Sequence, residues 1–268
     1  MRLLGVEIRR SLHRRVVWTL VLLALALCGT TGVIAFATSG ATTPAELAEE
    51  VHPAAMATWS DLAGDGALTI AALFLLLGGL FGGASVAGAE WRAGTITTLL
   101  TWEPRRARAH LARLGACAAC AAGIAWLLQV VYLSSLLPAV LAHGTADGVD
   151  GAWWTGLALA TLRVSVLTAA AAVLGASLAT VGRNTAFGVM AVFGWLTVGE
   201  GLLRGLRPSI TPHLLAENIG TVLTWARLDA GTASRTPVVA AAALGTYATV
   251  VVLAGLAGFV RRDVAAAT

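Results

Sequence analysis

Long apolar runs alternate with shorter polar segments along this chain of 268 residues. A helix needs about 20 apolar residues to cross a hydrocarbon core of about 30 Å. Six runs meet that length, at residues 16–38, 67–89, 114–143, 155–181, 185–206 and 237–260. The pattern therefore predicts an all-α polytopic membrane protein, with six transmembrane helices in a single transmembrane domain over residues 1–268.

The polar segments at 1–14 and 207–236 also carry structural signals. Leu4, Ile8 and Leu12 form an apolar stripe among arginines, which predicts an amphipathic interfacial helix over 1–14. The alternative is an ordinary basic flank of the first span. That span exceeds the 7–15 apolar residues of a signal peptide, so we interpret it as an uncleaved anchor. The 207–236 segment, rich in proline and apolar residues, predicts a short helix that re-enters or lies on the outer leaflet.

Charge patterning fixes the expected orientation. Hydrophobic residues make up 57% of the chain and charged residues only 12%, and all 18 basic residues are arginine. Thirteen arginines lie in or beside 1–15, 90–113, 182–184 and the C-terminus, against four on the other side. The positive-inside rule therefore predicts that both termini are cytoplasmic. Because most arginines lie on one predicted side of the membrane, the net charge of +4 does not indicate nucleic-acid binding. Arginine without lysine, with abundant Ala, Gly and Val, suggests the plasma membrane of a high-GC bacterium.

The absence of lysine also excludes a phosphate-binding loop of the GxxxxGK[ST] type, whose lysine contacts the nucleotide phosphates. Any nucleotide hydrolysis would therefore belong to another chain. Cys117-x-x-Cys120 has the spacing of a metal or redox pair. It lies in an Ala-rich apolar run with no second pair, so we interpret both cysteines as small helix residues and predict no metal site.

The densest polar segment is 90–113, between the second and third spans. It reads Glu90-Trp91-Arg92-Ala93-Gly94-Thr95-Ile96, then Leu99-Leu100-Thr101 and Pro104-Arg105-Arg106. This series resembles the cytoplasmic stretch of type-2 ABC transporter permeases, which has an acidic residue, Gly-Thr, a hydrophobic pair and then Pro with a nearby Arg. The six spans and the structured segment before the last span are also similar to that family.

The resemblance implies a transmembrane permease subunit that pairs with a second copy or a related permease. Two separate ATP-binding subunits would dock on its cytoplasmic face and would hold ATP and Mg²⁺, so no cofactor is expected on this chain. The implied ATPase-coupling residues are Glu90, Trp91, Arg92, Gly94, Thr95, Ile96, Thr98, Leu99, Leu100, Pro104, Arg105 and Arg106. A plain basic loop is the alternative; it explains the arginines but not Glu90 or Gly94-Thr95.

Charged residues inside the predicted spans are costly and usually paired. Arg163 and Glu200 lie roughly 9–12 Å below the outer surface at 1.5 Å per residue, and Arg204 is one turn beyond Glu200. We expect Arg163, Glu200 and Arg204 to form one structural network. The alternative is that Arg163 contacts an anionic group of a substrate.

The second span contains two overlapping GxxxG spacings, Gly78/Gly82 and Gly79/Gly83, which allow close helix contact. In the resembled family spans two and five line the central path. That resemblance implies path-lining roles for Phe74, Phe81, Phe193 and Trp195, with ordinary packing as the alternative.

Three classes of function are compatible with six spans. An ATP-driven exporter is preferred, because the chain lacks the EAA-type docking loop of classical importers and its outer loops are short. A secondary transporter would favour internal repeats and midplane ionisable residues, and neither stands out. An intramembrane enzyme would need clustered polar groups within the spans, whereas all five histidines lie at or outside span ends.

Overall fold

The protein is an all-helical bundle with one small two-stranded addition. The computed structural model describes residues 2–40, 67–96, 101, 105–146, 148–230 and 233–261. Six helical stretches are long and apolar enough to cross a membrane, which confirms the predicted number of spans. They are α2 (Arg15–Ser39), α5 (Ala67–Arg92), α7 (Arg106–His143), α8 (Gly151–Gly182), the continuous stretch Thr185–Leu206, and α12 (Pro237–Arg261).

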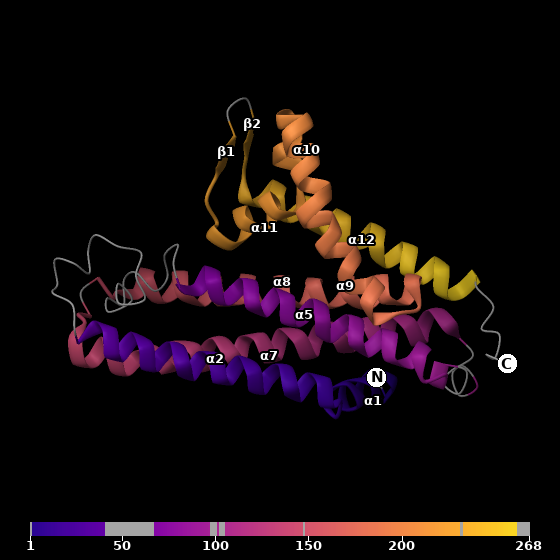
Figure 1. Cartoon of the computed structure of the whole chain (residues 1–268), viewed down its shortest axis with the longest axis horizontal. Coiled ribbons are helices and arrows are strands. Elements are labelled where there is room, and N and C mark those ends of the chain that lie inside the picture. Colours follow the sequence, from indigo (N-terminus) through magenta and orange to yellow (C-terminus); the bar gives the residue numbers. More distant parts are fainter. Residues whose placement is uncertain are drawn as a thin grey trace.

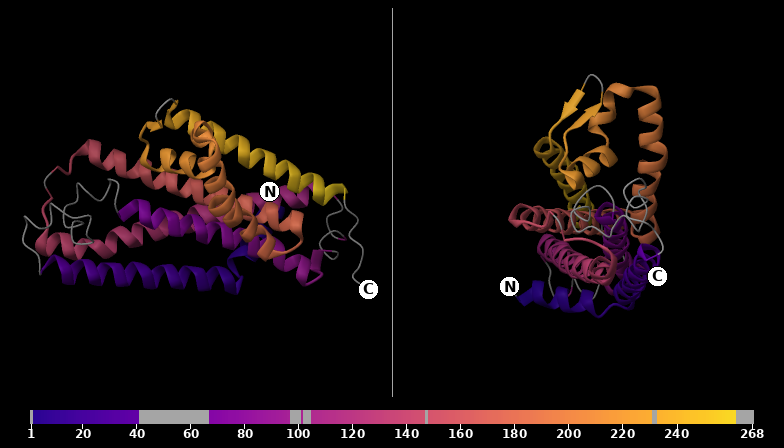
Figure 2. Two further views of the ribbon diagram at one scale, coloured as in Figure 1. Left: turned by 45° about the horizontal axis from the view of Figure 1, so that its top comes forward. Right: turned by 90° about the vertical axis from the view of Figure 1, so that its left-hand side faces the viewer.

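Four of these helices run side by side and form the body of the molecule (Figure 1). α2 packs on α7, α7 packs on α8, and α8 packs most extensively on α5. The fifth stretch consists of α9 (Thr185–Gly194), a π-helical turn (Trp195–Gly199) and α10 (Glu200–Leu206). In Figures 1 and 2, α10 leans away from the four-helix body, while α12 returns across α8.

Only one of the two GxxxG spacings makes the close contact between α5 and α8. A Cβ atom at Gly79 would lie 2.6 Å from the carbonyl oxygen of Thr168, and one at Gly83 only 1.9 Å from that of Ala172. A Cβ at Gly78 or Gly82 would meet no atom within 4 Å. Glycine therefore lets two backbones touch on one face of α5, whereas the other glycine pair faces open space.

The N-terminal helix α1 (Arg2–Leu12) turns two polar residues toward the bundle. Glu7 and Ser11 are buried, whereas Leu4, Val6 and Leu12 are exposed. Arg9 and His13 are exposed as well, so apolar and basic side chains share the outer face of α1. The interfacial position predicted for 1–14 stays a prediction.

Five chain segments meet at one end of the bundle: α1, the end of α5, the start of α7, the turn between α8 and α9, and the end of α12 (Figure 1). We call this the arginine-rich end. The third helix reaches farther toward it than expected, because α7 begins at Arg106 and not near residue 114. At the opposite end, Ser39 Oγ and His143 Nδ1 lie 3.1 Å apart and join α2 to α7.

The segment between the fifth span and α12 is compact. It contains a 3₁₀-helix (Pro208–His213), α11 (Leu215–Thr224), and strands β1 (Leu228–Ala230) and β2 (Ala233–Arg235). The strands pair antiparallel, with Leu228 opposite Arg235. The sequence predicted a short helix here, but it did not predict the strands. α11 buries Val222 and Leu223 against α8 and α12, so this segment packs on the side of the bundle (Figure 1).

Candidate functional site

The carboxylate of Glu90 is the centre of a buried charge cluster at the arginine-rich end. Glu90 lies in the last turn of α5 and is 2% exposed. Its Oε1 lies 3.1 Å from Arg10 Nη1 and 3.1 Å from Arg14 Nη2. Its Oε2 forms an ion pair with Nη2 of Arg113, which is completely buried. One carboxylate thus joins α1, the α1–α2 junction, α5 and α7.

The cluster carries more positive than negative charge. Glu7 lies 3.8 Å from Arg10 and supplies the second carboxylate, so two acids face three arginines. Burial lowers the pKa of the Arg14 guanidinium, and the charge of Glu90 opposes that shift. An arginine nevertheless stays protonated in a protein. The buried Arg113 guanidinium is therefore charged, and the Glu90 carboxylate neutralises that charge.

An aromatic layer extends the cluster to α12. The ring of Phe259 stacks on His110 with centroids 5.2 Å apart, and it meets Trp91 edge-on at 6.3 Å. The Arg113 guanidinium lies 5.9 Å from the Phe259 ring centroid, and that of Arg183 lies 4.9 Å from the ring of Trp91. Movement at the end of α5 would therefore reach α7, α12 and the α8–α9 turn through direct contacts.

The predicted coupling residues divide into inward-facing and outward-facing ones. The side chains of Glu90 and Ile96 are buried, and Trp91 is half-buried. Arg92, Gly94 and Thr95 are exposed. Gly94 has φ +66, a left-handed conformation that glycine adopts without strain, and it ends the helix. The exposed turn 92–95 therefore directly follows two residues, Glu90 and Trp91, that are anchored in the buried cluster.

The structure describes only some of the remaining coupling candidates. Thr98, Leu99, Leu100 and Pro104 lie outside the described residues. Arg105 is exposed, and Arg106 donates a 3.3 Å hydrogen bond to the carbonyl oxygen of Val260 in α12. Sequence reasoning did not find Arg10, Arg14, Arg113 or Phe259 as partners of this segment. They lie too far apart along the chain for spacing to connect them.

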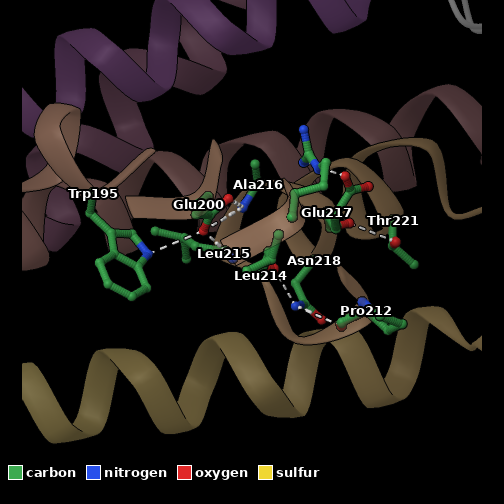
Figure 3. Close-up of polar contacts among 10 residues, drawn as sticks. Trp195, Glu200, Pro212, Leu214, Leu215, Ala216, Glu217, Asn218 and Thr221 are labelled. Atoms are coloured by element: carbon green, nitrogen blue, oxygen red, sulfur yellow. Dashed lines mark hydrogen bonds and ion pairs between the residues drawn. The ribbon is translucent and has the colours of Figure 1, made fainter. Parts of the chain in front are cut away.

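The second polar cluster surrounds Glu200, where the fifth stretch meets α11 (Figure 3). Glu200 is 1% exposed and directly follows the π-helical turn of the fifth span. Its Oε1 accepts hydrogen bonds from Trp195 Nε1 at 3.2 Å and from the backbone N–H of Leu215 at 2.5 Å. Its Oε2 accepts from the N–H of Ala216 at 3.1 Å. The carboxylate therefore caps the N-terminus of α11, where free N–H groups and the helix dipole favour negative charge.

Arg163, Glu200 and Arg204 do not form the one network that we expected, because each contacts a different partner. Arg204 instead forms an ion pair with Glu217, at 2.5 Å. The Arg163 guanidinium lies 5.1 Å from the ring centroid of Trp225. The prediction was wrong because the fold of 207–236 brings α11 and Trp225 to these charges, and sequence spacing does not show that fold. All three charges nevertheless contact other residues, which favours a structural role.

The capping role of Glu200 gives a testable expectation. Glu200→Gln keeps one acceptor oxygen but loses the negative charge, whereas Glu200→Ala removes both acceptors. We expect destabilisation of about 1 kcal/mol for the glutamine variant and about 2–3 kcal/mol for alanine. Thermal unfolding in detergent would measure both. If Glu200→Ala unfolded like the unmodified protein, Glu200 would not anchor α11.

Two of the path-lining candidates lie in α5. Phe74 and Phe81 are largely exposed, and Phe81 meets Phe193 of α9 with ring centroids 6.3 Å apart. Trp195 is 48% exposed and its ring N–H is held by Glu200. Exposed aromatic rings on a membrane-spanning bundle suit contact with lipid or with a partner subunit equally well.

Comparison with known proteins does not assign a family: no family model matches the chain, and no curated protein matches it. The structure supports one class, a multi-pass helical membrane protein with six spans. Among the described residues, no group of three His, Cys, Asp or Glu side chains could hold a metal ion.

Proposed function

We propose that this chain is the transmembrane permease subunit of an ATP-driven exporter. Two copies, or one copy and a related permease, would form the translocation path in a plasma membrane. Two ABC-type ATP-binding subunits would dock at the arginine-rich end, which would face the cytoplasm together with both termini. ATP and Mg²⁺ would bind to those subunits and not to this chain.

One observation carries the proposal: an exposed turn is fixed to a buried junction of several helices. A docking element must present side chains to its partner and must pass the partner's movement to the rest of the bundle. The turn 92–95 is exposed at the end of α5, and Glu90 directly before it contacts Arg10, Arg14 and Arg113. The resemblance of 90–106 to the coupling stretch of type-2 ABC permeases supports the same assignment.

The buried cluster suggests how the movement would spread. Buried ion pairs have strict geometry, because displacing one member leaves the other charge without compensation. A push on the turn would shift Glu90, and Arg113 and Arg14 would move with it. The first and third spans would then tilt with the second as one body.

Copurification tests the proposal directly. The tagged chain, expressed in its native host and purified in mild detergent, is expected to carry an ATP-hydrolysing subunit with it. Gly94→Val forces a branched residue into a left-handed conformation and should reduce the copurified ATPase activity at least tenfold. Gly94→Asn is the matched control, since asparagine tolerates that conformation.

Two results would overturn this assignment. One is the recovery of the unmodified chain without any ATPase, even after crosslinking in the membrane; that result would favour a secondary transporter or an intramembrane enzyme. The other is full ATPase recruitment by Gly94→Val.

A further inference from the structure

Arg163 is a charged residue on an apolar, exposed strip of α8. Leu159 and Val166 lie four residues before it and three residues after it, so they share its side of the helix. Both are exposed, and so is the neighbouring Leu162. Because α8 is long and apolar enough to cross a membrane, lipid would cover this strip. An arginine in such a place is costly unless another group compensates its charge.

The Arg163 guanidinium has no negative partner in the described part of the chain. It forms no ion pair and no hydrogen bond with a described residue. Its Nε is buried without a hydrogen-bond partner, whereas both Nη atoms keep contact with the surface of this half-buried side chain. The ring of Trp225, with its centroid 5.1 Å away, holds the guanidinium but offers no acceptor oxygen. The two Nη groups can therefore donate to an anion that approaches from outside.

The acidic side chains that the structure describes away from the arginine-rich end already have partners. Glu200 caps α11, Glu217 pairs with Arg204, and Asp150 caps the start of α8. Compensation for the charge of Arg163 must then come from outside this set.

Arg163 lies about one membrane thickness from the Glu90 cluster. α5 and α8 run in the same direction, and Gly79 lies level with Thr168. Glu90 follows Gly79 by eleven residues and Arg163 precedes Thr168 by five, which separates the two charges by roughly 24 Å along the helices at 1.5 Å per residue. Helical side chains tilt toward the N-terminus of their helix, and this moves the guanidinium still farther from Glu90. The separation thus approaches the hydrocarbon thickness of about 30 Å.

This depth places the guanidinium at the level of lipid headgroups. Clustered arginines belong at a membrane surface, so the Glu90 cluster marks one boundary of the hydrocarbon. The Arg163 guanidinium then lies at the other boundary, where the phosphate groups of lipids are the abundant anions. Trp225 is 47% exposed and fits the same boundary, because tryptophan is enriched where headgroups meet hydrocarbon.

We propose that Arg163 binds the phosphate of a phospholipid in the leaflet farther from the arginine-rich end. Its two Nη groups donate to two oxygens of the phosphodiester, the bidentate geometry that suits a guanidinium. The acyl chains run from there over Leu162 and Val166 toward the arginine-rich end. A free phosphate ion would gain nothing from these apolar side chains, so the ligand is the lipid and not the ion. The site does not depend on the proposed ATPase partner.

Photocrosslinking in nanodiscs tests the site with the full-length protein. The probe is phosphatidylglycerol with a diazirine near the start of one acyl chain, and the matched compound is the diacylglycerol with the same chains and no phosphate. Each is a small fraction of the total lipid. We expect the probe to label the peptide around Leu162 and Val166 at least tenfold more strongly than the diacylglycerol does, as charge-assisted hydrogen bonds give. Labelling of α2, whose exposed side chains meet lipid without such a site, should be equal for both compounds and serves as the reference.

Three variants test whether Arg163 itself holds the phosphate. Arg163→Gln keeps a polar side chain but removes the charge, and it should reduce labelling of α8 by the probe at least tenfold while labelling of α2 is unchanged. Arg163→Lys keeps the charge and should retain most of the labelling, since lysine also pairs with phosphate. Arg207→Gln is the matched control, because Arg207 is an exposed arginine at the end of α10, and its loss should change nothing. If the glutamine variant fails to fold, the comparison of the two lipids on the unmodified protein decides the question.

Four results would contradict the proposal. Equal labelling of the α8 peptide by phospholipid and diacylglycerol would mean that no phosphate is held there. Undiminished labelling of folded Arg163→Gln would assign the phosphate to another residue. Displacement of the probe by excess inorganic phosphate would make the ligand a free anion. Stronger labelling by a fatty acid that carries the same diazirine would make it a carboxylate.

Discussion

Replacing Glu90 with glutamine is expected to destabilise the bundle by about 3–5 kcal/mol, the usual cost of removing one partner from a buried ion pair. The substitution changes little in volume, but it leaves Arg113 fully buried without a countercharge. It also leaves Arg10 and Arg14 facing Arg113 across a short distance. Thermal unfolding in detergent, followed by circular dichroism, should show a much lower melting temperature and a reduced yield of folded protein.

Glu217→Gln provides the matched control for this experiment. Glu217 also pairs with one arginine, Arg204, but both side chains are partly exposed, at 26% and 50%. Exposed ion pairs contribute about 0–1 kcal/mol, so this variant should unfold close to the unmodified protein. Equal melting temperatures for Glu90→Gln and Glu217→Gln would show that the Glu90 cluster does not hold the arginine-rich end together.

The second large effect is expected at Gly83. Adding one methyl group by Gly83→Ala would put a Cβ atom 1.9 Å from the carbonyl oxygen of Ala172, far inside contact distance. Backbone atoms cannot rotate away as a side chain can, so α5 and α8 must separate along their length. Overpacking of this kind costs about 1–3 kcal/mol and sometimes more. Unfolding by increasing amounts of sodium dodecyl sulfate would measure the loss.

Gly82→Ala, one residue earlier, is the control. Its Cβ meets nothing within 4 Å, and alanine favours the helix by about 1 kcal/mol over glycine. We therefore expect Gly82→Ala to be neutral or stabilising. If both alanine variants behaved alike, the α5–α8 contact would not depend on the close approach of the two backbones.

The helices could be predicted from sequence because hydrophobic length is a local property. A run such as 185–206 needs no information from elsewhere in the chain to be identified as a span, and the structure has a helical stretch over the same residues. The π-helical turn inside it, Trp195–Gly199, could not be predicted. Glu200 directly follows this turn and contacts α11, which begins fifteen residues later, so no local pattern shows the contact.

The candidate site was only partly predictable for the same reason. Glu90 was singled out because an acidic residue followed by Gly94-Thr95 resembles the pattern of type-2 ABC transporter permeases and is not explained by a plain basic loop. Sequence alone suggested that it faces a partner, whereas its side chain points inward to Arg14 and Arg113. Which side of a helix faces its neighbours depends on tertiary packing. In a membrane protein the outward side is as apolar as the inward one, so hydrophobic patterning does not distinguish them.

The Glu90 cluster also imposes an order on biosynthesis. Arg14 leaves the ribosome 76 residues before Glu90, an interval of roughly 4–15 s at about 5–20 residues per second. During that time Arg10 and Arg14 have no acid from the later spans to neutralise them. The exposed leucines of α1 can meanwhile rest on the lipid surface, with its arginines near anionic headgroups. The bundle can close at this end only after the second and third spans have been inserted, so α1, which is made before them, is among the last elements to be fixed in place.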